Sequence, residues 1–310
     1  MSGLFNTYFY GKAGKGDFTP DQLPKNRLEL FLTALRGQFG KLFWLNLLYD
    51  VFCIPLFFWL LLNFQVLTNY AEQTGSVMGF VNDGYLSTFL MGMIPCLALM
   101  GVGSSGQMYC LRNWSRDQHS FMMSDFKDSI KLNWKQGLGF GAINGLSLFL
   151  VFICWVYYGA LAETNVFFLV PQVLVVVIVT VWWMMNMLAF PMIVTYEMKF
   201  KDIVRNCALI AVARLPWSVL FLALTVVLPA ALFMLVPNVL FMLILGAWFL
   251  FFGFSFNGLV YASYANACFD KFLNPRIEGA KVGQGMRDPA LDFADEADEE
   301  EVRKEIEAMK

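Results

Sequence analysis

Charged side chains are scarce in this sequence: they make up 15% of its 310 residues, whereas apolar residues make up 58%. A soluble globular domain contains about 25% charged and about 45–50% apolar residues. The deficit of charge excludes a disordered chain and argues against an ordinary soluble enzyme. So large an apolar content indicates a chain that crosses a lipid bilayer.

Residue types that carry catalysis or bind metals are also few. The sequence has one His, His119, and six Cys without a C-x-x-C pair, which we interpret as free thiols. It contains no nucleophile motif or dinucleotide fingerprint. The glycine-rich run 101–106 lacks the Lys of a phosphate loop, and its small residues suit close helix approach or local unwinding. We expect no catalytic residues, no metal site, no cofactor and no nucleic-acid partner.

Six runs with little or no charge are long enough to cross a bilayer. A helix rises about 1.5 Å per residue, so about 20 residues cover a hydrocarbon core of about 30 Å. The runs are continuously apolar rather than alternating, which favours helices over β-strands. They occupy residues 42–64, 85–111, 138–162, 166–196, 216–236 and 240–262. We predict an all-α, polytopic membrane protein with six transmembrane helices.

Basic residues are confined to alternate connections of this plan. All 22 Lys and Arg lie in four segments, at residues 1–41, 112–137, 197–215 and 263–310. The other three connections carry only acidic charges, at Glu72, Asp83 and Glu163. Basic connections of a membrane protein stay in the cytoplasm. We therefore predict that both termini are cytoplasmic.

The same division predicts three parts of the chain. Residues 1–41 form a cytoplasmic segment with an amphipathic helix, residues 42–262 form the transmembrane domain, and residues 263–310 form a cytoplasmic acidic tail. The last stretch, 288–310, carries ten acidic and three basic residues. A charge run of this kind is typical of a solvated tail. Contact with the basic inner face or with a partner is the alternative.

A short amphipathic cytoplasmic stretch precedes each outward-going span. Before the third span, apolar residues recur every four positions, at Met122, Phe126, Ile130 and Trp134, beside a row of Lys. The sequence F-K-D occurs there and again before the fifth span. Two interpretations stay open: a basic helix on an anionic membrane surface, or a docking platform for a partner. The candidate docking residues are Phe126, Lys127, Asp128, Lys131, Phe200, Lys201, Asp202 and Arg205.

Asp50 is the only charged residue inside a predicted span, and Asn46 lies one helical turn before it. A carboxylate at this depth is costly unless it is protonated, paired or near water. One interpretation is a polar or ion-binding site that Asn46 and Asp50 share with other polar residues of the spans. The residues that would complete it are Gln107, Asn144 and Asn186. The other interpretation is an interhelical hydrogen-bond clamp.

One set of residues in the first two spans and in the loop after the second span forms a recognisable pattern. It consists of Pro95, the run 101–112, Arg116, Asp125-Phe126-Lys127-Asp128, Lys131, the run 133–137, and Leu45-Asn46-Leu47-Leu48 of the first span. This pattern resembles the YesL-like family of bacterial membrane proteins. Val102 departs from the family, which often has Pro at this position. The resemblance implies a multi-pass protein of the bacterial cytoplasmic membrane.

Members of that family are often encoded beside carbohydrate ABC importers and glycan-degrading enzymes. The resemblance therefore implies a non-catalytic accessory subunit of an oligosaccharide import system, with the lipid bilayer and the ABC permease and ATPase subunits as partners. The residues themselves leave an alternative open, a stand-alone transporter or channel for a small solute with a polar site around Asp50. A membrane enzyme is disfavoured because no carboxylate pair, His cluster or nucleophile–base spacing occurs.

Overall fold

The computed structural model describes residues 23–75, 84–236 and 238–287, and every regular element within them is a helix. Six helices in these ranges are long and apolar enough to cross a membrane, so the predicted all-α class and the six apolar helices are confirmed. They are α2 (Arg27–Thr74), α4 (Tyr85–Trp114), α5 (Met122–Thr164), Val166–Ile193, Leu215–Phe233 and Val239–Arg276. The predicted acidic stretch 288–310 lies outside the described residues.

The last three of these helices are composite. The fourth joins the 3-10 turn η2 (Val166–Phe168) to α6 (Leu169–Ile193). The fifth and the sixth each contain one π-helical turn, a feature frequent at functional sites. The fifth consists of α8 (Leu215–Leu222), η3 (Ala223–Val227) and α9 (Leu228–Leu235). The sixth consists of α10 (Val239–Trp248), η4 (Phe249–Gly253), α11 (Phe254–Phe272) and η5 (Asn274–Arg276).

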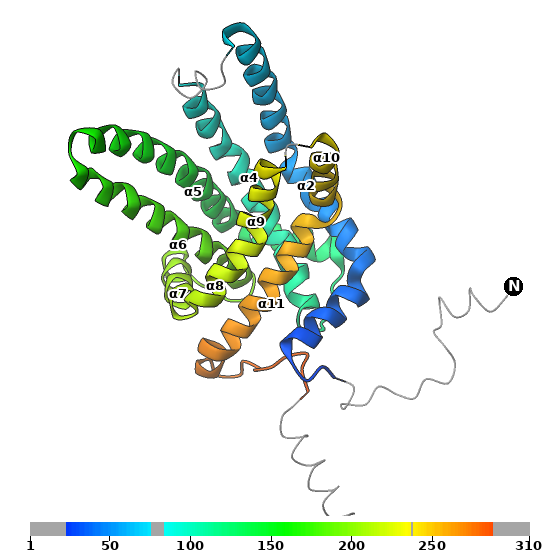
Figure 1. The fold of residues 1–310 in the computed structure, drawn as a ribbon. Coiled ribbons are helices and arrows are strands. Elements are labelled where there is room, and N and C mark those ends of the chain that lie inside the picture. Colours follow the sequence, from blue (N-terminus) through cyan, green and yellow to red (C-terminus); the bar gives the residue numbers. More distant parts are fainter. Residues whose placement is uncertain (1–22, 76–83, 237, 288–310) are drawn as a thin grey trace, which may run out of the picture.

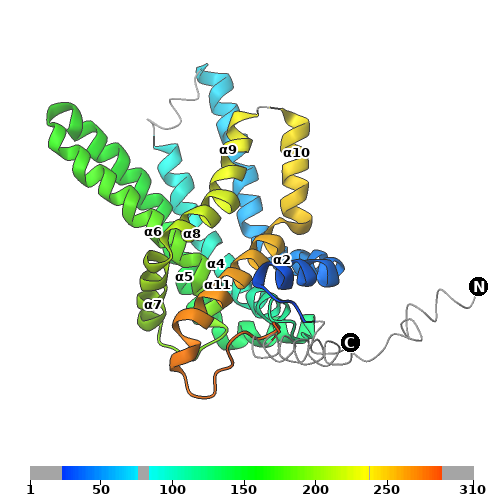
Figure 2. The same cartoon turned by 60° about the horizontal axis from the view of Figure 1, so that its bottom comes forward.

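The helices form three hairpins that spread apart from a common base (Figures 1 and 2). The hairpins are α2 with α4, α5 with α6, and α9 with α10. Figure 2 shows α7 (Phe200–Ala213), the end of α11 and the first turns of α2 at the base. Buried residues concentrate where the helices meet, and α10 contributes none of them.

Two of the three amphipathic stretches differ from the prediction of short separate helices. The first begins at its cap, where Asn26 Oδ1 accepts from Glu29 N over 2.9 Å, and continues without a break into the span as α2. The second is likewise continuous with α5. Only the third, α7, is a separate helix, because Pro216 starts a new helix directly after it. Nothing in the backbone interrupts the first two at the predicted membrane boundary.

Glycines let α4 and α5 approach closely. A Cβ atom on Gly101 would lie 2.2 Å from the carbonyl oxygen of Gly137, and one on Gly141 would lie 2.2 Å from that of Leu97. No side chain fits at such a distance, so these positions bring two backbones into contact. The small residues of the run 101–106 therefore serve helix packing.

Candidate functional site

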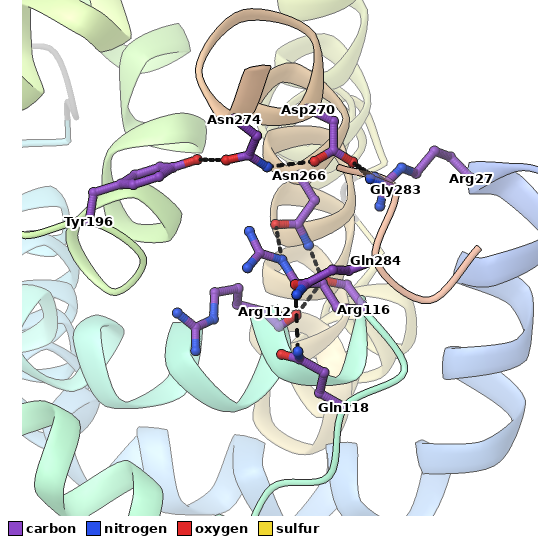
Figure 3. A network of polar contacts seen from close by, with 11 residues as sticks. Arg27, Arg112, Arg116, Gln118, Tyr196, Asn266, Asp270, Asn274, Gly283 and Gln284 are labelled. Carbon is purple, nitrogen blue, oxygen red and sulfur yellow. Dashed lines mark hydrogen bonds and ion pairs between the residues drawn. The ribbon is translucent and has the colours of Figure 1, made fainter. Parts of the chain in front are cut away.

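A polar network closes the base of the molecule (Figure 3). Arg116, in the loop after α4, donates from Nε to Asn266 Oδ1 of α11 over 2.9 Å. Asn266 Nδ2 donates to Ser115 Oγ over 2.7 Å. Burial, together with the nearby Arg112 guanidinium, lowers the pKa of Arg116 to about 10. The side chain stays cationic at neutral pH, so a charge-assisted bond holds the loop to the last helix.

Asp270, near the end of α11, is a second centre of the same network (Figure 3). It forms an ion pair with Arg27 at the start of α2. Its carboxylate also accepts from Asn274 Nδ2 over 2.6 Å and from Gly283 N over 3.0 Å. The hydroxyl of Tyr196 donates to Asn274 Oδ1 over 2.5 Å, and burial raises the pKa of this phenol to about 12. One carboxylate thus ties α2 to the segment that follows α11.

These contacts join all four basic segments of the sequence at one end of the molecule. Arg27 of the first segment meets Asp270 of the fourth, and Arg116 of the second meets Asn266 of the fourth. The third segment joins the second, because Gln136 Nε2 donates to the carbonyl of Met198 over 2.9 Å. The hairpin tips lie at the opposite end (Figures 1 and 2).

The Phe of each F-K-D element packs inward. Phe126 is 4% exposed; its ring lies 6.0 Å from that of Phe52, and it packs against Gly106. Phe200 is half-buried, 4.7 Å from the ring of Phe140. Both aromatic rings therefore anchor their helices to the bundle rather than extend a docking surface.

The charged residues of the two F-K-D elements are exposed. Asp128 pairs with Lys131 at 2.9 Å, and the hydrogen bond and charge of that Lys hold the pKa of the carboxyl below its usual range. These exposed candidates are Lys127, Asp128, Lys131, Lys201, Asp202 and Arg205. In each F-K-D element, the charged side chains thus point outward and the aromatic side chain packs against the helix bundle.

Asn46 of α2 holds the π turn of the sixth helix. Its Nδ2 donates to the carbonyls of Phe249 and Leu250, each over 3.0 Å, and its Oδ1 accepts from Ser255 N over 2.8 Å. The residue is fully buried. A π turn leaves backbone groups without their usual helical partners, and a side-chain amide supplies both a donor and an acceptor. Asn46 therefore clamps α2 to η4.

Asp50 lies beside this clamp. Asn46 Nδ2 donates to Asp50 Oδ2 over 3.1 Å, and Asp50 is 7% exposed. Its Oδ1 has no hydrogen-bond partner among the described residues. The geometry around this pair favours the clamp over a shared polar site, because Gln107, Asn144 and Asn186 line a cavity that Asn46 and Asp50 do not line.

That cavity has a volume of about 600 Å³ and lies between α4, α6 and the fifth and sixth apolar helices. Most of its lining consists of Met, Leu, Val and aromatic side chains. Both π turns contribute to the wall, through Thr225 and Phe249. A concave, mostly apolar space with a few polar groups is the usual form of a small-molecule site.

The three predicted polar residues in the cavity wall are each fixed by one neighbour. Gln107 Nε2 donates to Ser255 Oγ over 3.1 Å. Trp182 links the other two, since its Nε1 donates to Asn144 Oδ1 over 2.8 Å and its carbonyl accepts from Asn186 Nδ2 over 2.9 Å. Each side chain keeps hydrogen-bonding capacity beyond that single bond.

Asn257 and Tyr261 of α11 also line the cavity and were not among the predicted site residues. Tyr261 donates to Thr225 Oγ1 over 2.7 Å, and Asn257 Nδ2 donates to the Thr225 carbonyl over 3.4 Å. The two residues are four positions apart and thus share a helix face. That spacing of two polar residues in an apolar run was the available signal.

No protein-family model, no curated protein and no solved structure matches this chain. The YesL-like resemblance of the second span therefore stays a prediction. Within the ranges that the structure describes, no three His, Cys, Asp or Glu residues are grouped so that they could hold a metal ion.

Proposed function

We propose that this chain is a non-catalytic, multi-pass protein of the bacterial cytoplasmic membrane. The base of the molecule, where the Lys-rich and Arg-rich segments meet, and both termini then lie in the cytoplasm. The meeting of the four basic segments at one end supports this orientation, since Lys and Arg are retained on the cytoplasmic side. The last turn of α5, which carries Glu163, then faces outward.

On this orientation, the protein is an accessory subunit of an oligosaccharide ABC import system and contacts the permease or the ATPase from the cytoplasmic side. The assignment to an oligosaccharide import system comes from the resemblance to the YesL-like family. The observation that carries a docking role is the pair of F-K-D elements, each with exposed charges and an inward-packed ring, buried in Phe126 and half-buried in Phe200. Exposed charge rows direct partner choice and orientation more than they add affinity.

A charge-reversal variant tests this function. Full-length protein is extracted from its native membrane, and co-purified permease and ATPase are quantified by mass spectrometry. The test variant carries Lys127→Glu, Lys131→Glu, Lys201→Glu and Arg205→Glu, all at exposed positions. We expect it to lose most of the co-purified permease and ATPase.

A matched control reverses four other exposed cations, with Arg36→Glu, Lys41→Glu, Arg276→Glu and Lys281→Glu. It changes net charge equally and should retain the partners. Absence of permease and ATPase from the wild-type preparation, or an equal loss in both variants, contradicts the proposal.

The cavity favours a second candidate, a stand-alone transporter or channel for a small solute. Its polar residues then include Gln107, Asn144 and Asn186 rather than Asp50. In proteoliposomes loaded with a panel of radiolabelled neutral solutes, Gln107→Leu should abolish uptake while Asp50→Asn leaves it intact. No uptake by the wild type above protein-free vesicles excludes this candidate.

A further inference from the structure

We propose that the cavity binds a neutral, single-chain amphiphile with a hydroxyl-bearing head, of the monoacylglycerol class. The cavity volume of about 600 Å³ lies within the range of about 300–1,000 Å³ typical of sites for one small molecule. This inference depends on the cavity alone and on neither function proposed above.

The wall of the cavity selects against charge. None of the described residues that line it is Asp, Glu, Lys, Arg or His. An ion in such an apolar space would lose its hydration without gaining a counter-charge. The occupant is therefore a neutral molecule.

The polarity of the wall changes along the helices. On α4, Leu97 and Met100 come before Ser104 and Gln107, which lie nearer the base. On the sixth apolar helix, Met242 and Leu245 lie far from the base, and Asn257 and Tyr261 follow in α11, nearer to it. On the fifth helix, the lining residues beyond Thr225, from Val226 to Phe233, are apolar, and Leu222 lies on the base side of Thr225. On α6, Met187 and Phe190 likewise lie on the base side of Asn186. The end of the cavity far from the base is therefore apolar and the polar side chains lie in its base half, which fits a molecule whose head lies in that half and whose apolar chain lies between the spreading hairpins.

The polar end of the wall offers unused donors and acceptors. Gln107 and Asn257 each donate one hydrogen bond through the amide nitrogen, and their oxygens have no partner among the described residues. Asn144 accepts from Trp182, and its Nδ2 has no partner among those residues. A hydroxyl both donates and accepts, so hydroxyls satisfy the oxygens and the amide together.

The side of the cavity at α10 gives a route from the bilayer. Met242, Leu245 and Gly246 of α10 line the cavity, and α10 has no buried residue. An amphiphile dissolved in the membrane can therefore reach the cavity past α10 without crossing water.

Photo-crosslinking tests the inference on full-length protein in nanodiscs. Three probes carry the same diazirine-bearing chain: a monoacylglycerol, a fatty acid and an alkane without a head. We expect the monoacylglycerol to label peptides of α4, α9 and α11, with competition by unlabelled monoolein. The charged fatty acid and the headless alkane should label these peptides at least about tenfold less, because several hydrogen bonds are lost. Equal labelling by the alkane overturns the proposal.

Two variants locate the site. An ideal Cβ on Gly246 meets nothing within 4 Å, so Gly246→Phe fills the cavity without a backbone clash and should reduce labelling about tenfold or more. Gly40→Phe is the control, because Gly40 also faces open space and does not line the cavity. Asn257→Leu should lower monoacylglycerol labelling by roughly twofold to tenfold and leave alkane labelling unchanged. Unchanged labelling in both Gly246→Phe and Asn257→Leu contradicts the inference.

Discussion

Replacement of Asn46 by Leu tests the clamp between α2 and the π turn η4. The substitution removes two bonds to the carbonyls of Phe249 and Leu250, one to Asp50 Oδ2 and one from Ser255 N. Hydrogen bonds between membrane helices average about 0.6 kcal/mol, and a buried polar group left unpaired costs about 1–3 kcal/mol. Part of the loss is recovered by local rearrangement of the backbone. We expect the free energy of unfolding to fall by about 2–4 kcal/mol.

The assay is unfolding by SDS titration in mixed micelles, followed by tryptophan fluorescence. Asn63→Leu is the matched control, since Asn63 lies in the same helix and its Nδ2 bonds only the carbonyl of Trp59, one turn away. The control should change stability by less than about 0.5 kcal/mol. If Asn46→Leu is no more destabilising than Asn63→Leu, the clamp has no structural role and the argument for it is wrong.

Two further substitutions test the packing, with the same unfolding assay. Gly101→Ala should destabilise by about 1–3 kcal/mol because its Cβ would meet the Gly137 carbonyl, whereas Gly37→Ala, in open space, should be neutral or stabilising. Phe126→Ala should cost about 3–5 kcal/mol and Lys127→Ala less than about 0.5 kcal/mol, because only the Phe is buried. Equal effects within either pair contradict the assigned packing.

Sequence patterns predicted the parts of the fold that depend on local composition. The six apolar runs follow from hydropathy alone. The ends of the helices were harder, since hydropathy detects the apolar part of a helix and not its continuation. The helix α2 continues through Arg36 and Lys41 because no Pro lies there and because Gly37 and Gly40 do not adopt the left-handed conformation of a helix cap.

The π turns were beyond local prediction. Phe249–Gly253 contains only Phe, Leu and Gly, and its stabilising partner Asn46 lies about 200 residues away in the sequence. The candidate site shows the same limit. Asn46 and Asp50 do not line the cavity that Gln107 lines. Which residues of a helix line a cavity depends on how the helix is rotated about its axis and on where it crosses its neighbours. Neither quantity is contained in the spacing of residues along one helix.

The proposed function depends on the end of the molecule that carries the Lys and Arg residues lying in the cytoplasm. One cysteine-accessibility measurement tests this orientation. Single cysteines are placed at Glu163, in the last turn of α5, and at His119, in the loop after α4, in a variant whose six native cysteines are replaced. A membrane-impermeant maleimide applied to intact cells should modify position 163 and leave position 119 unmodified until the membrane is permeabilised. Modification of position 119 alone in intact cells would contradict the account.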